Sequence, residues 1–171
     1  ESPLDEKLIW AGPDDGNLQY STDAGKTWTN VAGNYARAGI PAQAWVSSIE
    51  PSHFDKNVVY ATFDNHMYGD HKTYLGYSAD MGRNWKQISN PEFTGFAHKI
   101  RQDIINKELL FLGTEMGLFG SLDGGQNWFF LLAGMYIFEF DFATEQAGWI
   151  NTSNGLVYYT TDAMESYKIS N

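Results

Sequence analysis

The sequence Tyr20-Ser-Thr-Asp-Ala-Gly-Lys-Thr-Trp28 contains a motif that the chain repeats, Ser-x-Asp-x-Gly-x-(Thr/Asn)-Trp. Two further copies run over residues 78–85 and 121–128, and a divergent fourth copy runs over residues 160–167. In each copy the Asp can hydrogen-bond to its own backbone, the Gly supplies a position with positive φ, and the Trp starts a returning strand and packs in the core. The motif therefore predicts a hairpin turn that recurs about every 40 to 60 residues, as in solenoid or propeller repeats. We assign a structural role to its residues: Ser21, Asp23, Gly25, Trp28, Ser78, Asp80, Gly82, Trp85, Ser121, Asp123, Gly125, Trp128 and Asp162.

The composition fits one globular domain. The chain has 171 residues, of which 43% are hydrophobic and 16% aromatic, enough for a single packed core. No apolar run reaches about 18 residues, so no membrane span is expected. The absence of cysteine excludes a disulfide framework. The chain starts at Glu1 without a signal peptide, which we interpret as a mature or excised piece.

The net charge of −10 argues against nucleic acid as a partner, because nucleic-acid binding needs a basic surface. An acidic surface favours cations, cationic peptides or neutral sugars. The alternative is that the charge serves only to keep the domain in solution.

Short β-rich runs surround each motif and can be written as four strands, a to d. Strand a is expected at 45–49, 98–102 and 136–140, and strand b at 8–12, 58–62, 109–113 and 147–151. Strand c is expected at 17–20, 74–77, 117–120 and 155–159, and strand d at 27–31, 84–88, 127–131 and 166–169. No strand a precedes the first strand b, because residues 2–7 already match the later a–b turns. An open strand edge needs a cover. We therefore expect a fragment of a larger propeller, another segment or a second copy that completes the ring, or a small ring that closes imperfectly.

The repeated motif resembles the Asp-box (bacterial neuraminidase, BNR) repeats of sortilin-type and glycoside-hydrolase-74-like β-propellers. Residues 45–55, 63–66 and 112–119 are also similar to bacterial secreted proteins of that group, and the resemblance covers roughly residues 4 to 130. The fourth box departs from it, with Met164 in place of Gly and Tyr167 in place of Trp. The resemblance implies an all-β propeller segment of antiparallel four-stranded blades, three complete and the first incomplete. The expected blades are residues 4–33, 45–90, 97–133 and 135–170, in a protein that is secreted, periplasmic or on the cell surface.

Antiparallel blades sort their loops onto two faces. The a–b turns and the Asp boxes share one face, and the b–c turns share the other with the d–a links. The insertions at residues 32–44, 64–73 and 89–97 fall on the second face, and long loops on a rigid scaffold are where binding is usually found. We predict ligand-binding residues on this loop face: Asp15, Tyr35, Arg37, His66, Tyr68, Asp70, His71 and Phe96. We assign the recurring tryptophans to packing: Trp10, Trp28, Trp85, Trp128 and Trp149.

Three functions compete for the loop face. A carboxylate pair drawn from Asp14, Asp64 and Glu115 could hydrolyse a glycosidic bond. The segment His66-x-x-x-Asp70-His71 contains ligand types for a transition metal, and an oxygen-rich set on this face could hold calcium, although the spacing matches no metal motif, and no other cofactor is expected. The third function is binding of a glycan or of a peptide or protein without chemistry, and this is the function that we prefer. The alternative is a polysaccharide-cleaving glycoside hydrolase whose cleft needs a second propeller half.

Sialidase activity is disfavoured. A sialidase would need a cluster of arginines to hold the carboxylate of its substrate. The chain has only Arg37, Arg83 and Arg101, and Arg83 lies inside a box.

Overall fold

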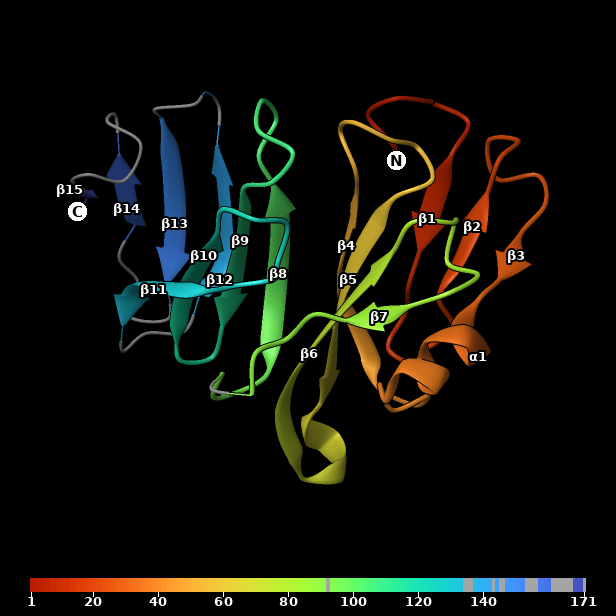
Figure 1. The fold of residues 1–171 in the computed structure, drawn as a ribbon, viewed down its shortest axis with the longest axis horizontal. Helices are drawn as coiled ribbons and strands as arrows, with labels where there is room; N and C mark the ends of the chain where they lie inside the picture. Colours follow the sequence, from red (N-terminus) through yellow and green to blue (C-terminus); the bar gives the residue numbers. More distant parts are fainter. Residues whose placement is uncertain are drawn as a thin grey trace.

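The computed structural model describes residues 1–91, 93–133, 137–142, 144, 147–152, 157–160 and 168–170. Within these ranges the strands form four antiparallel sheets that follow one another along the chain (Figure 1). The first sheet contains β1 (Ile9–Ala11), β2 (Gln19–Ser21) and β3 (Thr29–Asn30). The second contains β4 (Trp45–Pro51), β5 (Val59–Asn65), β6 (Asp70–Ser78) and β7 (Lys86–Gln87). The third contains β8 (Ala97–Gln102), β9 (Leu110–Thr114), β10 (Gly117–Ser121) and β11 (Phe129–Ala133). The fourth contains β12 (Ile137–Phe142), β13 (Gly148–Thr152), β14 (Val157–Thr160) and β15 (Lys168–Ser170).

The sheets are the blades that the sequence predicts, with three strands in the first and four in each of the others. We number them blade 1 to blade 4. The inner strand of each complete blade contacts that of the next, β4 against β8 and β8 against β12. The fourth box, with Asp162, lies outside the described residues. No helix in the described part of the chain is long and apolar enough to cross a membrane.

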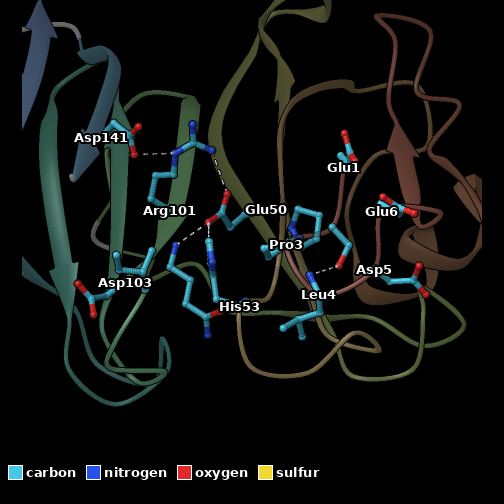
Figure 2. A pocket seen from close by; sticks show the side chains of 14 residues that line it. Glu1, Pro3, Leu4, Asp5, Glu6, Glu50, His53, Arg101, Asp103 and Asp141 are labelled. Atoms are coloured by element: carbon cyan, nitrogen blue, oxygen red, sulfur yellow. Dashed lines mark hydrogen bonds and ion pairs between the residues drawn. The ribbon is translucent and has the colours of Figure 1, made fainter. Parts of the chain in front are cut away.

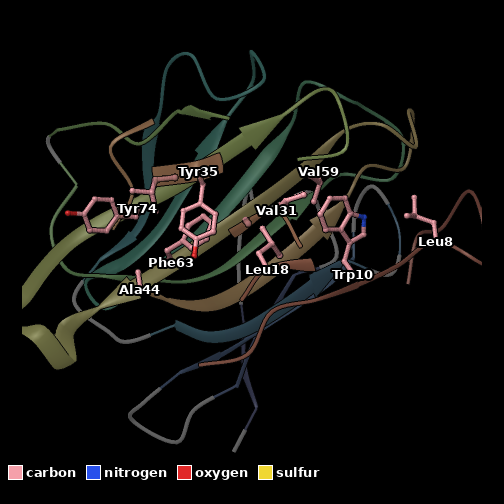
Figure 3. Packing of buried hydrophobic residues seen from close by; sticks show 11 residues of the cluster. Leu8, Trp10, Leu18, Val31, Tyr35, Ala44, Val59, Phe63 and Tyr74 are labelled. Atoms are coloured by element: carbon pink, nitrogen blue, oxygen red, sulfur yellow. The ribbon is translucent and has the colours of Figure 1, made fainter. Parts of the chain in front are cut away.

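Hydrophobic cores fill the spaces between successive blades. The core between blades 1 and 2 takes Leu8, Trp10 and Leu18 from one side and Val59 and Phe63 from the other (Figure 3). Similar cores lie between blades 2 and 3 and between blades 3 and 4. Because neighbouring residues of a strand point to opposite sides of the sheet, each strand supplies side chains to the blades on both sides. This arrangement explains why the predicted strands contain continuous apolar runs.

The three described Asp boxes have the hydrogen bonds that the motif predicts. In each box the serine Oγ accepts from the backbone N–H of the box glycine at 2.8–2.9 Å. The Asp Oδ1 accepts from the backbone N–H four residues later at 2.8 Å. The box glycines have φ of 85°, 74° and 87°, a conformation that other residues adopt only with strain. The box is therefore a self-contained turn.

The loops divide between two faces as the antiparallel order requires. Each box donates a backbone N–H to the a–b turn of its own blade: Ala24 to Lys7, Met81 to Asn57 and Gly124 to Glu108, at 2.9–3.0 Å. The opposite end, at the bottom of Figure 1, carries the helix α1 (Ala32–Tyr35) and the β5–β6 hairpin. That hairpin contains the 3-10 turn η2 (His66–Tyr68), and a second 3-10 turn, η1 (Ala36–Ala38), follows α1.

The assignment of five tryptophans to packing is correct for three. Trp10 is buried, and Trp85 and Trp128 pack against the interblade cores. Trp28 and Trp149 are 42% and 38% exposed, so the prediction is wrong for these two. They lie at the two ends of the row of blades, where no blade within the described ranges packs against them.

Candidate functional site

The loop face holds a fixed histidine. Asp64, near the end of β5, is buried, and its Oδ1 and Oδ2 lie 2.7 and 2.8 Å from His66 Nδ1. Asp64 Oδ1 also accepts a hydrogen bond from the His66 backbone N–H at 2.9 Å. Because these contacts all use Nδ1 and the backbone, Nε2 is the ring nitrogen that a ligand can use. The His66 side chain is 33% exposed, so a ligand can reach it.

Aromatic rings from three other segments surround His66. Its ring stacks on Phe96 with centroids 4.8 Å apart and an angle of 23°. Trp45 meets it edge-on at 5.6 Å, and His71 lies at 6.5 Å. Phe96 itself is buried, so it supports the His66 ring from the protein interior. The prediction that Phe96 contacts a ligand directly does not fit this position.

The hairpin tip beyond His66 is exposed and apolar. Tyr68 is exposed, as predicted for a ligand-binding residue, and so is its neighbour Met67, which the sequence analysis did not select. Both residues lie in η2, which ends at Gly69 with φ of 72°. The tip therefore presents two large side chains beside the imidazole of His66.

Asp70 has a structural role in this hairpin. Its Oδ2 accepts from Tyr74 Oη at 2.7 Å and from Asn65 Nδ2 at 3.1 Å. Burial raises the pKa of Asp70, but the hydrogen bonds from Tyr74 and Asn65 outweigh it and leave that pKa lowered. Burial and the bond to Asp70 raise the pKa of Tyr74 to about 12. Asp70 is thus engaged in fixing the hairpin.

His98 and Glu115 adjoin the His66 cluster. The ring of His98, on β8, lies 4.9 Å from that of Phe96. Burial lowers the pKa of His98, and the negative charges of Asp64 and Glu115 act in the opposite direction. Glu115, in the β9–β10 turn, donates its backbone N–H to Phe96 O at 3.1 Å. Two of the candidate carboxylates, Asp64 and Glu115, therefore act on one imidazole.

The other predicted site residues lie apart from this cluster. Tyr35 is fully buried and donates its hydroxyl to the carbonyls of Gly16 and Ala42, so the prediction that it binds a ligand is wrong. Asp15 is exposed and caps its own loop by accepting from the Asn17 backbone N–H at 3.0 Å. Asp14 and Arg37 are exposed on segments of blade 1 and of the link that follows it.

Metal ligands do not converge in the described residues. No group of three His, Asp or Glu side chains there is placed to hold a metal ion. The mixture of His66, Asp70 and His71 in one hairpin therefore does not by itself define a calcium site.

A cavity of about 750 Å³ lies on the opposite face, where the sequence analysis placed no site (Figure 2). It is lined by residues 1–6 and by the ends of the inner strands. Glu50 is buried there and accepts from Arg101 Nη1 at 2.9 Å and from the Gln102 backbone N–H at 3.2 Å. Asp141 Oδ1 lies 3.9 Å from Arg101 Nε. Burial raises the pKa of Glu50 in spite of the Arg101 charge.

These charged residues could have been found by aligning the inner strands. Glu50 pairs with Tyr60, Arg101 with Phe111, and Asp141 with Trp149. The three partners hold the same position in strand b of successive blades. The charged residues therefore form a row of alternating sign across the inner strands, and all three line the cavity.

Comparison with known proteins agrees with this architecture. The family described as BNR/Asp-box repeat matches residues 19–30. A GH74 xyloglucanase from Xanthomonas campestris superposes on 98% of the chain with a TM-score of 0.77 and 16% sequence identity. A GH74 enzyme from Niastella koreensis superposes on 100% of it with a TM-score of 0.79 and 17% identity. The chain has the fold of a β-propeller segment, with Asp-box turns in its blades.

A third structure similar to this Asp-box propeller is the extracellular domain of a one-component-system protein from B. thetaiotaomicron. It has a TM-score of 0.70 and 16% identity over 95% of the chain, which corresponds to 21% of that protein. The propeller spans 29% of each of the two GH74 enzymes. No curated protein matches its sequence significantly. At these identities the similarity establishes the fold alone.

Proposed function

We propose that this Asp-box propeller is a non-catalytic binding scaffold whose ligand contacts the loop face around His66. The observation that carries the proposal is the imidazole of His66, which Asp64 holds at Nδ1 and Phe96 supports by stacking, while one third of the side chain stays exposed. A polar group that is fixed before binding loses little conformational freedom when the ligand arrives.

A neutral glycan is the ligand class that fits best, with a peptide as the second choice. Tyr68 supplies an exposed aromatic ring, and His66 and His71 supply hydrogen-bonding groups beside it. The net charge of −10 disfavours anionic ligands. Similar folds belong to a xyloglucanase and to an extracellular domain, which supports a polysaccharide ligand and a location outside the cytoplasm.

Catalysis has weaker support. Both carboxylate oxygens of Asp64 face His66 Nδ1, so Asp64 is engaged as a positioning group. Asp14 lies in blade 1 and Glu115 in blade 3. In favour of a glycoside hydrolase are the presence of two carboxylates near His98, Asp64 and Glu115, and the similarity in fold to GH74 enzymes. A hydrolase would use these two carboxylates as its acid and base.

Calorimetric titration with xyloglucan oligosaccharides tests the binding function. We expect measurable binding that weakens at least tenfold in His66→Ala. The matched control is His53→Ala, which removes a partly exposed histidine on the cavity face and should bind like the unchanged protein. A peptide library displayed on beads tests the second ligand class. Binding that is equal in both variants would place the ligand elsewhere.

An assay for released reducing sugar separates binding from hydrolysis. We expect no turnover of xyloglucan or β-glucan by the purified protein. Turnover that disappears in both Asp64→Asn and Glu115→Gln would establish the hydrolase and refute a purely binding role.

A further inference from the structure

A groove of about 400 Å³ lies between blades 2 and 3, on the face that carries the a–b turns and the Asp boxes. Blade 2 contributes three aromatic side chains to its wall and blade 3 contributes mainly polar ones, among them Phe54, Tyr60 and Tyr77 from the first and Lys107, Glu108 and Gln126 from the second. We call it the interblade groove. It lies on the face opposite the His66 cluster, and none of the residues that surround His66 lines it.

The first two junctions between blades are built alike. A Cβ atom on Gly82 would lie 3.0 Å from Val31 Cγ2, and one on Gly125 would lie 2.7 Å from Ile88 Cδ1. Val31 and Ile88 follow the outermost strand of the preceding blade. The junction that holds the groove can therefore be compared with the first junction position by position.

Two positions are filled differently at the two junctions. Met81 packs against the core of the first junction, whereas Gly124 holds its place in the box of the second. Trp10 and Tyr60 are also equivalent, because each pairs with the tyrosine that precedes the box serine. The smaller side chains at the second junction leave open the space that Met81 and Trp10 fill at the first.

The hydroxyl of Tyr60 is the polar group that the groove leaves without a protein partner. The Tyr60 side chain is only 4% exposed, and its hydroxyl makes no hydrogen bond to another described residue. The hydroxyl oxygen is not sealed from solvent, so it opens into the groove. Burial raises the pKa of Tyr60, and the hydroxyl therefore stays protonated and can both donate and accept. A polar group this deeply buried is expected to bond to whatever occupies the groove.

The charges around the groove nearly balance. Its cations are Lys86 and Lys107, and its anions are Asp55, Glu108 and Asp123. Asp123 is already engaged in its own box, and Lys107 Nζ lies 3.7 Å from Glu108 Oε1. A strongly charged ligand would gain little here, whereas a neutral ligand with several hydroxyls can use donors and acceptors alike.

We propose that the interblade groove binds one pyranose unit of a neutral glycan, with the Tyr60 hydroxyl as its polar anchor. A groove of this volume with an aromatic wall and a few polar groups is typical of a small-ligand site. The apolar face of a sugar ring packs on aromatic side chains, and Phe54 is 41% exposed at this site. An apolar peptide side chain would leave the Tyr60 hydroxyl and the polar wall unpaired, at a cost in affinity. This site is separate from the one around His66, and a glycan can bind here whether or not one binds there.

Amide NMR titration of the full chain with methyl β-glucoside, methyl β-xyloside and methyl β-galactoside tests the proposal. We expect at least one of the three to shift the amide signals of Gly124 and Gln126. Tyr60→Phe removes only the hydroxyl and should weaken binding about three- to tenfold, which is the value of one hydrogen bond. Gly124→Met should abolish binding, because it restores the side chain that fills the first junction. Met81 has φ of 60° at the equivalent position, so methionine can adopt the backbone conformation that the box needs.

Two further variants serve as controls. Tyr74→Phe removes a hydroxyl that donates to Asp70 Oδ2 at 2.7 Å, so it should lower stability in urea and leave the groove shifts unchanged, whereas Tyr60→Phe should keep its stability. His66→Ala should also leave the groove shifts unchanged, which separates this site from the one on the loop face. A loss of stability in Tyr60→Phe equal to that in Tyr74→Phe would contradict a hydroxyl that faces the groove. The proposal would be overturned by an absence of shifts at Gly124 and Gln126 with all three glycosides, by shifts that Tyr60→Phe and Gly124→Met both leave unchanged, or by shifts there with capped tripeptides alone.

Discussion

Glu50 and Arg101 occupy equivalent positions on neighbouring inner strands, and Arg101 Nη1 donates to Glu50 Oε2 at 2.9 Å. Glu50 is buried, and its pKa is raised because burial outweighs the attraction of Arg101. Blades 2 and 3 are thus joined by a charged pair at the edge of the cavity as well as by their hydrophobic core.

Replacing Arg101 by Met should lower the free energy of unfolding by about 3 kcal/mol at pH 7, because it leaves a buried carboxylate without its cation. Lys99→Met is the matched control: Lys99 pairs with the exposed Glu139 at 3.2 Å, and loss of such a pair costs less than about 1 kcal/mol. Urea unfolding measures both. The cost of Arg101→Met should shrink in acid, where Glu50 is protonated. Equal costs for the two variants would contradict a buried pair.

Ser78→Ala should lower the free energy of unfolding by about 1–2 kcal/mol, as the loss of a capping hydroxyl does elsewhere. Ser78 is buried, donates to Asp80 Oδ1 at 2.9 Å and accepts from the Gly82 N–H. The exposed Thr22→Ala is the control and should be near neutral. Thermal and urea unfolding of the two variants give the comparison, and a neutral Ser78→Ala would mean that the box holds without its hydroxyl.

The Asp boxes should make the fold sensitive to strong acid. Hydrogen bonds from Thr27 and Asn127 hold the pKa of Asp23 and Asp123 at about 2, against an ordinary value of 3.8. A lowered folded-state pKa contributes stability above the ordinary value, and that stability is lost as the pH falls from about 3.8 through 2. Carboxyl carbon chemical shifts in an NMR titration report these pKa values directly. Midpoints near 3.8 would show that the box hydrogen bonds do not persist in solution.

His98 should make the stability of the fold depend on pH in a higher range than the Asp boxes do. Its pKa is lowered from 6.5 because burial disfavours the imidazolium. The unfolded chain therefore binds a proton first, and stability that is present above pH 6.5 decreases as the pH falls below it. Urea unfolding at pH 7.5 and pH 5.5 should show this loss, and His98→Gln should reduce it. An unchanged difference in His98→Gln would assign the effect to another group.

Most of the fold follows from one repeated turn. The spacing of Asp23, Asp80 and Asp123, together with the apolar runs around them, predicts the number of blades and the division of the loops between two faces, because an antiparallel blade has only one way to alternate its turns. The sequence pattern does not reveal what packs against each tryptophan. Trp28 and Trp85 look alike in sequence, but the packing of blade 1 against blade 2 partly buries Trp85, whereas Trp28 is exposed.

The candidate site was predicted in part. The grouping of Asp64, His66 and Tyr68 follows from their shared hairpin, which the sequence places on the loop face. The burial of Tyr35 could not be predicted from the neighbouring sequence, because it depends on the carbonyls of Gly16 and Ala42, which lie in two separate loops. The cavity was missed for a related reason: it forms between inner strands whose charged residues are about 40 to 50 positions apart, and each of them alone resembles a solvated surface residue.

The contact between a box glycine and the aliphatic residue after the preceding blade bears on how such a protein can grow in evolution. Gly82 faces Val31 and Gly125 faces Ile88, so both of these junctions place a β-branched aliphatic side chain against a box glycine. Duplication or deletion of a gene segment that encodes one whole blade of this kind would again place an aliphatic side chain against a glycine, whereas the fourth box, with Met164 in place of the glycine, departs from this pattern. A duplication that began in the middle of a blade would not repeat this contact. The whole blade is therefore the unit whose duplication or deletion preserves this contact between blades.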